Sequence, residues 1–383
     1  MPDESRKLIV LSLKWYDLRI HQGVLKFARE QNWDVVASPH MHLALDIPEA
    51  AGQIVMIGSP DRQRLAIAQK YNHPVVDIGN YHPEIPLPRV LTDNRTVGRL
   101  AAQAFAKRGF KHTVIFSTQA HAFPNDRTEG FLDETKASGL HCDQWHISQP
   151  DSHKGSYDLD QLMKSSLTQK LLKAPKPLAV FAIEDDGAAL LQRACIRLGI
   201  YVPEEVSIIG VNNDPLICPY ATVPISSIDL NWEEVGYRAA ALLNRLMKGG
   251  KPPLRNEYIA PQGLIVRQSS DVDAVEDLRV ARALTYIRNH RHQPISVKDI
   301  AAHLGMPLRT LQWAFKQSRG NSLNDEIQAQ RLEKTKEMLI KNGQKLSDIA
   351  DHLGFSSAQH LNNYFTKLTG TTPNEFRQQN KES

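Results

Sequence analysis

The heptapeptide DIAAHLG at residues 299–305 recurs as DIADHLG at residues 348–354, 49 positions further along the chain. Six of the seven positions are identical. Each copy has the pattern of a short helix that ends in glycine, the residue that most easily takes the left-handed backbone conformation of a tight turn. The repeat therefore predicts two copies of one small helical unit in the C-terminal part of the chain.

A second helix is predicted after each copy of the heptapeptide. Leu311 and Phe315 mark its buried face in the first unit, and Leu361 and Phe365 mark it in the second. A helix, a short glycine-containing turn and a second helix form the helix-turn-helix pattern, whose second helix enters the major groove of DNA. The C-terminal part of the chain is therefore predicted to be an all-α domain with two helix-turn-helix motifs.

A longer helix is predicted between the two units, over residues 323–341, and the pair Ser322 and Asp325 has the spacing of a capping box at its start. Such a helix spans roughly 28 Å at about 1.5 Å per residue. A rigid spacer of this length can place two reading helices in successive segments of the major groove, about 34 Å apart.

Charge is unevenly distributed along the 383 residues. From Arg279 to the end there are 16 Lys and Arg against 9 Asp and Glu, whereas the preceding part carries 30 against 33. A basic domain is expected to meet phosphate groups. Charge alone is equally compatible with a solvated basic face, so the DNA-binding interpretation depends on the motifs, and a helical protein-interaction module is the alternative for this region.

These C-terminal residues resemble the AraC-type DNA-binding domain over residues 277–379. The resemblance rests on Gly320, Ser322, Ile327, Arg331, Leu332, Ile349, Ala350, Gly354, Phe355, Phe365, residues 370–373, Phe376 and Arg377. It implies that base contacts come from Arg309, Thr310, Gln312 and Trp313, and then from Ala358, Gln359 and Asn363. Trp313 and Asn363 stand where an arginine is common. Asparagine and glutamine can read adenine, whereas Trp313 can either stack on DNA or pack in the core.

The first 270 residues alternate short β-rich runs with helical segments, as at 8–13, 54–57, 75–78, 113–116, 178–183 and 206–211. Strands separated by helices predict parallel, doubly wound sheets. Residues 199–214, which read GIYVPEEVSIIGVNND, and the segments around residues 90–112, 127–131 and 182–189 resemble the periplasmic-binding-protein-like sensor of LacI-family regulators. The resemblance implies two α/β lobes around a cleft. We expect one lobe from the N-terminus to about Ser117 plus 228–248, and a second from 118 to 227 plus 251–269.

Several classes of site are not indicated by the sequence. GxGxxG, GxxxxGK[ST], HExxH and GxSxG are all absent, so no dinucleotide, P-loop, zincin or nucleophile-elbow site is predicted. The three cysteines are scattered, which predicts a reducing, cytoplasmic compartment without disulfides or zinc. The run at 8–13 is too short for a signal peptide, and no segment approaches the roughly 20 apolar residues of a membrane helix. We expect no enzyme, no cofactor, no metal and no membrane partner.

Ligands of doubly wound sheets bind at the carboxyl ends of the strands. A sugar needs hydrogen-bonding groups beside an aromatic wall. The residues at predicted strand ends that meet this need are Trp15, Tyr16, Asp17, Asp185, Asn212 and Asn213. Arg127 opens the first helix of the second lobe, where the resemblance implies a sugar-binding arginine. Asp17 and Asp185 are equally candidates for helix N-caps, and Trp232 is a stacking wall or a packing residue. Asn212 stands where the family usually has aspartate, and Leu230 where a polar residue is common.

We therefore predict a sensor domain at 1–270, a linker at 271–278 and a DNA-binding domain at 279–383. A sensor of this kind before an AraC-type domain is similar to the xylose-responsive regulators of enteric bacteria, and this resemblance alone suggests D-xylose as effector. Activation as the response is implied by the resemblance to AraC-type domains, which usually activate. The expected partners are promoter or operator DNA, a small sugar and a second copy in a homodimer, with RNA polymerase as a further candidate. The alternatives are an enzyme fused to the DNA-binding repeats, and a constitutive dimerising regulator whose front domain binds no sugar or binds a non-sugar effector.

Overall fold

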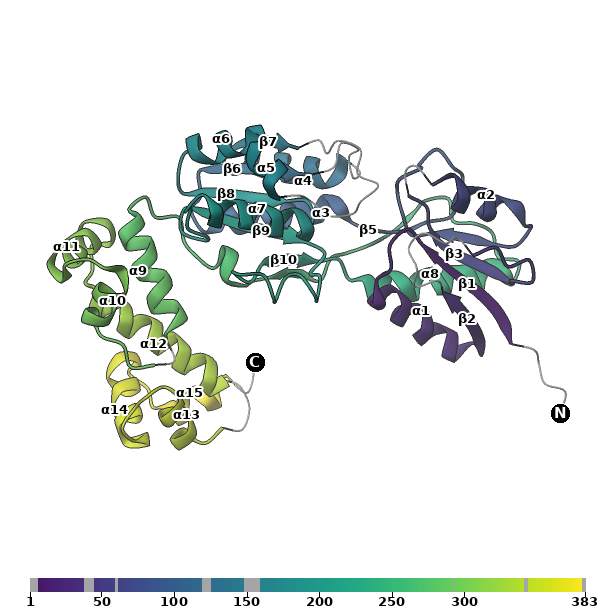
Figure 1. Ribbon diagram of the computed structural model, residues 1–383. Helices are drawn as coiled ribbons and strands as arrows, with labels where there is room; N and C mark the ends of the chain where they lie inside the picture. Colours follow the sequence, from purple (N-terminus) through teal and green to yellow (C-terminus); the bar gives the residue numbers. More distant parts are fainter. Residues whose placement is uncertain are drawn as a thin grey trace. The chain divides into compact units, whose positions relative to one another are not determined.

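The computed structural model describes residues 6–37, 45–58, 61–118, 125–147, 159–291, 293–340 and 344–380. The chain divides into two compact units, which are described separately below (Figure 1). The first comprises residues 1–174, 178–199 and 208–270, and the second comprises residues 175–177, 200–207 and 271–383. No helix among the described residues is long and apolar enough to cross a membrane.

The first unit contains two lobes, each built on its own sheet (Figure 1). The first lobe has four parallel strands in the spatial order β2 (Trp33–Ala37), β1 (Lys7–Leu13), β3 (Gly52–Met56) and β4 (Val75–Asp77). β3 and β4 are buried throughout, as expected for strands covered on both faces. The helix α2 (Arg62–Lys70) connects β3 to β4.

Two helices from distant parts of the sequence pack together on the first lobe. They are α1 (Leu18–Glu30) and α8 (Trp232–Met247), which lie side by side in Figure 1. Glycines make this approach close: a Cβ at Gly23 would lie 1.9 Å from the carbonyl oxygen of Glu233, and one at Gly236 would lie 2.2 Å from that of Ile20. No side chain larger than hydrogen therefore fits at either position without moving the backbone.

The second lobe is built on a sheet of six strands. Their spatial order is β12 (Gly263–Ile265), β10 (Ser226–Asp229), β9 (Val206–Val211), β8 (Leu178–Ala182), β6 (His112–Ser117) and β7 (His141–His146). β12 runs antiparallel to β10, whereas β6 runs parallel to both β7 and β8. The helices of this lobe are α3 (Asn94–Lys107), α4 (Asn125–Ala137), α5 (Leu159–Lys164), α6 (Ser166–Lys173) and α7 (Asp185–Arg197).

The position at which the chain first changes lobes differs from the prediction. The sequence predicted a first lobe that extends to about Ser117, but β6 pairs with β8 in the second sheet and α3 packs on α4. The chain therefore crosses at β5 (Val90–Thr92), which pairs in parallel with β11 (Glu257–Ile259) (Figure 1). The prediction was wrong because strand pairing, which assigns β6 to its sheet, leaves no local mark in the sequence.

Gly98 is expected to be intolerant of substitution, because a Cβ there would lie 2.0 Å from the carbonyl oxygen of Arg127 on α4. We expect Gly98→Ala to lower the free energy of unfolding of the first unit by about 1–3 kcal/mol, the usual effect of overpacking. Urea unfolding followed by tryptophan fluorescence can measure this, since four of the five tryptophans lie in the first unit. Arg99→Ala, on the exposed face of the same helix, is the control; equal transitions for both variants would contradict the expectation.

The second unit is helical over its described C-terminal residues. Its helices are α9 (Leu278–Asn289), α10 (Val297–Leu304), α11 (Leu308–Arg319), α12 (Leu323–Ile340), α13 (Leu346–His352), α14 (Ala358–Thr369) and α15 (Pro373–Gln379). α10 with α11, and α13 with α14, are the two predicted helix-turn-helix pairs. Gly305 and Gly354, which end the repeated heptapeptides, have φ values of 64° and 68° and so take the left-handed conformation.

Each helix-turn-helix pair has its own hydrophobic core. The first core gathers α9, α10 and α11 around Phe315, and the second gathers α13 and α14 around Phe365. The connecting helix α12 contributes to both, with Leu323 and Ile327 in the first and Met338 and Leu339 in the second. Ser322 and Asp325 hydrogen-bond reciprocally before α12, which confirms the predicted capping pair.

Candidate functional site

A cavity of about 440 Å³ lies in the first unit, between the strand ends of its two lobes. Its volume falls in the range of small-molecule sites, roughly 300–1,000 Å³. Residues of both lobes line it: Lys14, Trp15, Tyr16, Met56, Ile78, Gly79, Asn80, Tyr81, Leu91, Thr92, Asn94, Asp126, Arg127, Glu184, Asp185, Asp186, Val211, Asn212, Asp214, Ile217, Leu230, Trp232 and Tyr258. Aromatic, amide and charged side chains therefore face one space.

Five of the seven residues predicted to bind ligand line this cavity, and two do not. Trp15, Tyr16, Arg127, Asp185 and Asn212 belong to the lining, whereas Asp17 and Asn213 are absent from the set of lining residues that the structure describes. The prediction of a ligand contact for these last two residues is not supported by their positions.

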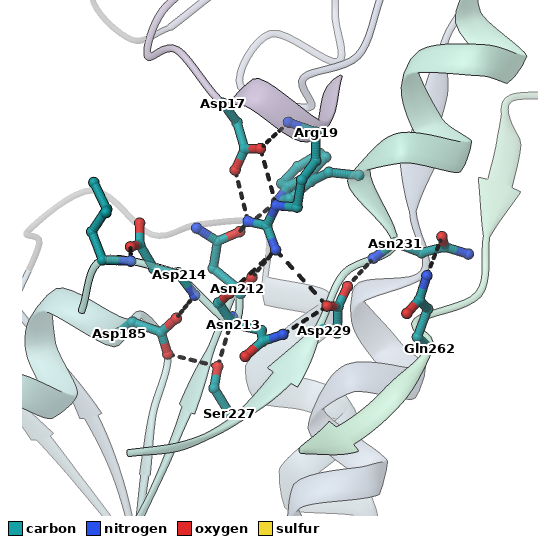
Figure 2. A network of polar contacts seen from close by, with 12 residues as sticks. Asp17, Arg19, Asp185, Asn212, Asn213, Asp214, Ser227, Asp229, Asn231 and Gln262 are labelled. Carbon is teal, nitrogen blue, oxygen red and sulfur yellow. Dashed lines mark hydrogen bonds and ion pairs between the residues drawn. The ribbon is translucent and has the colours of Figure 1, made fainter. Parts of the chain in front are cut away.

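Asp17 and Asn213 are held by neighbouring protein groups instead. Asp17 caps α1 by accepting a hydrogen bond from the Arg19 amide, and its carboxylate pairs with the Arg19 guanidinium at 2.7 Å. The Asn213 side chain donates to Asp229 at 2.9 Å and accepts from Arg267 at 2.7 Å. Figure 2 shows Asp17, Arg19, Asn213 and Asp229 as parts of one polar network.

Arg127 is a buried cation at the wall of the cavity. It is 4% exposed, and its Nε and Nη2 donate to Oδ1 of Asn94 at 3.0 and 2.6 Å. Its Nη1 donates to the carbonyl oxygen of Ile183. Burial lowers the pKa of Arg127 to about 10. This value is still well above 7, and the guanidinium therefore stays charged near neutral pH. Because these bonds hold the guanidinium, it is presented to a ligand in one orientation.

Asp185 lines the cavity, but both of its carboxylate oxygens are engaged. Oδ1 accepts from the Ser227 hydroxyl at 2.7 Å, and Oδ2 accepts from the Asp214 amide at 2.8 Å. Burial raises the pKa of Asp185 to about 6. The N-cap of α7 is Glu184, so Asp185 is the first helical residue rather than the cap. Its position favours a role in holding the loop after β9.

The aromatic wall of the cavity is built from residues of distant segments. Trp15 and Trp232 meet edge to face, with ring centroids 5.4 Å apart. Trp232 is 7% exposed and lines the cavity, so the wall and packing alternatives both hold for it. The Lys14 ammonium lies 4.5 Å from the ring centroid of Tyr81, and burial raises the pKa of Tyr81 to about 12.

Several lining residues were missed by the sequence analysis. Tyr81 follows β4, and Thr92 ends β5, so the strand-end rule that selected Asp185 could have selected both. The Thr92 hydroxyl is buried and has no hydrogen-bond partner among the described residues, which marks it as a group that a ligand hydroxyl could satisfy. Lys14 directly follows β1 and Asn94 follows β5, so the same rule could have selected these two residues as well.

The acidic segment from Glu184 to Asp186 does not assemble a metal site. Among the described residues, no group of three or more His, Cys, Asp and Glu side chains is placed to hold a metal ion.

In the second unit, the predicted DNA-contacting residues lie on α11 and α14. Arg309, Thr310, Gln312 and Trp313 are exposed on α11, and Gln359 and Asn363 are exposed on α14, whereas Ala358 is half-buried. Trp313 is 61% exposed, which excludes the core-packing alternative for it in this structure. The Gln359 amide donates to Oδ1 of Asn363 at 2.9 Å, so these two residues form one polar pair on the helix surface.

Comparison with known protein families matches two models to the chain. A periplasmic binding protein-like domain matches residues 102–270, and a helix-turn-helix domain matches residues 300–379. The chain therefore joins a periplasmic binding protein-like α/β domain to a helical helix-turn-helix domain, which confirms the predicted fold class.

Along its whole length the chain is similar to xylose operon regulatory proteins. It is 27% identical over 382 residues to that of Escherichia coli K12, with 96% of this chain and 95% of the relative covered. It is 24% identical over 391 residues to that of Haemophilus influenzae, with 98% and 99% covered. These homologues are transcription regulators.

Solved structures show the same fold. The structure of the xylose-binding transcription activator xylR matches with a TM-score of 0.72 and 24% identity, covering 98% of this chain and 99% of that one. A periplasmic binding protein/LacI transcriptional regulator from Alkaliphilus metalliredigens, complexed with D-xylulofuranose, matches with a TM-score of 0.53 and 18% identity. It covers 69% of this chain and 99% of its own.

Proposed function

We propose that this protein is a DNA-binding transcription regulator whose DNA binding is controlled by a small sugar in the cavity of the first unit. The observation that carries the proposal is the combination, in one chain, of a cavity with aromatic and hydrogen-bonding walls and two exposed helix-turn-helix faces. Full-length similarity to xylose operon regulatory proteins supports it. The proposed domains are 1–270, 271–278 as a linker, and 279–383.

The residues proposed to contact the sugar are those of the predicted set that line the cavity. Trp15, Tyr16 and Trp232 supply apolar faces for C–H groups, and Arg127 and Asn212 supply hydrogen-bond donors. The carboxylate of Asp185 is proposed to hold the loop after β9 rather than to contact the sugar directly. DNA is proposed to be read by Arg309, Thr310, Gln312, Trp313, Gln359 and Asn363, with Ala358 at the start of α14.

D-xylose is the first effector to test, because the relatives are xylose operon regulatory proteins and one similar structure is of a xylose-binding activator. By the same analogy we propose activation of sugar-catabolism genes by a cytoplasmic homodimer that acts with RNA polymerase at promoters. The sugar shifts the equilibrium between the forms of the protein by its differential affinity for them, since a ligand has no other means of shifting it. No catalytic role is proposed.

The second candidate is a regulator that binds DNA constitutively through its second unit, with a first unit that serves as a dimerising scaffold without a sugar or responds to a non-sugar effector. Leu230 favours it, because this cavity-lining position is apolar and 3% exposed. A polar residue there would provide a further contact for a sugar hydroxyl.

A thermal-shift experiment with a panel of pentoses and hexoses tests the proposal. We expect one sugar, D-xylose before the others, to raise the unfolding temperature of the full chain. A ligand at about 100 times its dissociation constant adds about 2.7 kcal/mol to the free energy of unfolding. L-xylose serves as a control of equal composition. If no sugar shifts the transition, the second candidate replaces the sugar-controlled regulator.

A further inference from the structure

The side-chain amide of Asn212 is held in one orientation at the cavity wall. Its Oδ1 accepts a hydrogen bond from Nη2 of Arg19 at 3.1 Å and another from Nε1 of Trp232. A guanidinium and an indole N–H can only donate, so the atom that faces them must be the oxygen. Figure 2 shows the Asn212 nitrogen on the side of the amide away from Arg19.

The backbone of Asn212 is held as firmly as its side chain. Its φ is 115°, a value that residues other than glycine rarely adopt. Its amide donates to the carbonyl oxygen of Ile228 at 3.0 Å, and its own carbonyl accepts from Nη1 of Arg19 at 2.9 Å. Strained conformations of this kind persist where neighbouring contacts overdetermine them, and they cluster at ligand sites.

The Nδ2 group of Asn212 has no hydrogen-bond partner among the described residues, although the residue lines the cavity. Of the lining residues near it at the ends of β9 and β10, Val211 and Leu230 are apolar. Asp214 also lines the cavity, and its Oδ1 accepts from the backbone amides of Leu216 and Ile217. The Asn212 side chain therefore has two N–H groups available to a ligand, whereas its oxygen already accepts from Arg19 and Trp232.

We propose that Asn212 is a donor-only specificity determinant, which selects ligands that place a hydrogen-bond acceptor against its Nδ2. The ring oxygen of a pyranose, a carbonyl oxygen, or a hydroxyl oxygen whose proton is donated elsewhere meets this condition. A ligand group that must donate its proton at this position is rejected, because Oδ1 already accepts from Arg19 and Trp232. The inference deepens the proposed function and rests on it.

Asn212→Asp tests the polarity of this contact, because a carboxylate has nearly the same shape as the amide but can only accept. One oxygen of the new carboxylate keeps the bonds from Arg19 and Trp232, and the second replaces the donor that faces the cavity. If the ligand accepts at this position, the variant loses the hydrogen bond and adds repulsion between oxygen lone pairs. If the ligand donates there, the variant gains a charge-assisted hydrogen bond and binds more tightly.

The experiment is calorimetric titration of the full chain and its Asn212→Asp and Asn212→Ala variants with D-xylose, L-arabinose, D-ribose, D-glucose and D-galactose. For the sugar that the wild type binds most tightly, we expect Asn212→Asp to weaken binding about tenfold or more, and by more than Asn212→Ala does. The matched control is Asn231→Asp, which adds the same charge. Asn231 directly precedes α8 and lies outside the cavity lining, and its Oδ1 accepts a hydrogen bond from Gln262.

Equal or tighter binding by Asn212→Asp would overturn the inference, and so would unchanged binding by both Asn212 variants, while the proposed function would stand. Should the wild type bind none of the five sugars, the sugar-controlled function falls and the inference falls with it. Thermal unfolding of each variant without sugar shows whether a loss of binding reflects a loss of the fold.

Discussion

Arg127→Ala is expected to abolish most of the response to sugar. The guanidinium lines the cavity and is oriented by Asn94 and the Ile183 carbonyl group. Hydrogen bonds from a charged donor contribute about 1.5–3 kcal/mol, so the loss of this contact should weaken sugar binding roughly 10- to 100-fold. Calorimetric titration with the effector sugar gives the change directly, and the thermal shift at a fixed sugar concentration should disappear with it.

Arg95→Ala is the matched control for Arg127→Ala. Arg95 lies on α3, is more than half exposed and pairs with Glu129 and Asp133 on α4, but it does not line the cavity. Because Arg127→Ala also leaves the Ile183 carbonyl oxygen without its bond, the unfolding transition without sugar is measured for both variants. If Arg127→Ala folds and still binds the sugar with wild-type affinity, Arg127 is not a ligand contact, although the sugar-controlled function stands.

The combined variant Gln312→Ala and Gln359→Ala is expected to lose most of its sequence-specific DNA binding. Each glutamine is exposed on one of the two proposed reading helices, α11 and α14. A specific contact to a base edge is worth about 1–3 kcal/mol, and distant contacts add, so the pair should cost about 2–6 kcal/mol. The DNA site is first selected from a random pool with the wild type, and affinities are then measured at one salt concentration.

Gln317→Ala with Gln378→Ala serves as the control for DNA binding. Both residues are exposed in the same unit, Gln317 near the end of α11 and Gln378 on α15. The reading-helix variant should approach the affinity of the wild type for unrelated DNA, since contacts to phosphate are unchanged. Equal affinities of the two double variants for the selected site would show that α11 and α14 do not read it through these glutamines.

The helical part of the fold was predictable because its determinants are local. Each of these determinants is a pattern within a short stretch of sequence. They are the helix-ending glycines Gly305 and Gly354, the capping pair Ser322 and Asp325, and the buried helix faces around Phe315 and Phe365. The doubly wound sheets were predictable from their alternation, whereas the first crossing between lobes was not. That crossing depends on the pairing of β6 with β8, which joins residues about 65 positions apart.

The site was predictable where a strand end alone brings a residue to the cavity, as for Trp15 and Asn212. The strand-end rule selected Asn213 equally, but this residue lies outside the described cavity lining because distant partners bind its side chain. Asn213 is bound by Asp229 and Arg267, and the part that Arg19 plays in holding Asn212 depends on a contact across 193 residues. Hydrogen-bond partners of this kind are decided by the tertiary fold and leave no periodic pattern in the sequence.

Because α1 packs against α8, the first lobe cannot be completed on the ribosome until α8 has been synthesised. The partner of α1 begins at Trp232, more than 200 residues after α1 itself. At roughly 5–20 residues per second, the second lobe is synthesised for ten seconds or more before α8 emerges. During that interval the face of α1 that packs on α8, around Gly23 and Phe27, lacks the helix that covers it in the finished protein. The nascent first lobe is therefore expected to expose this apolar surface until α8 has emerged and packed on it.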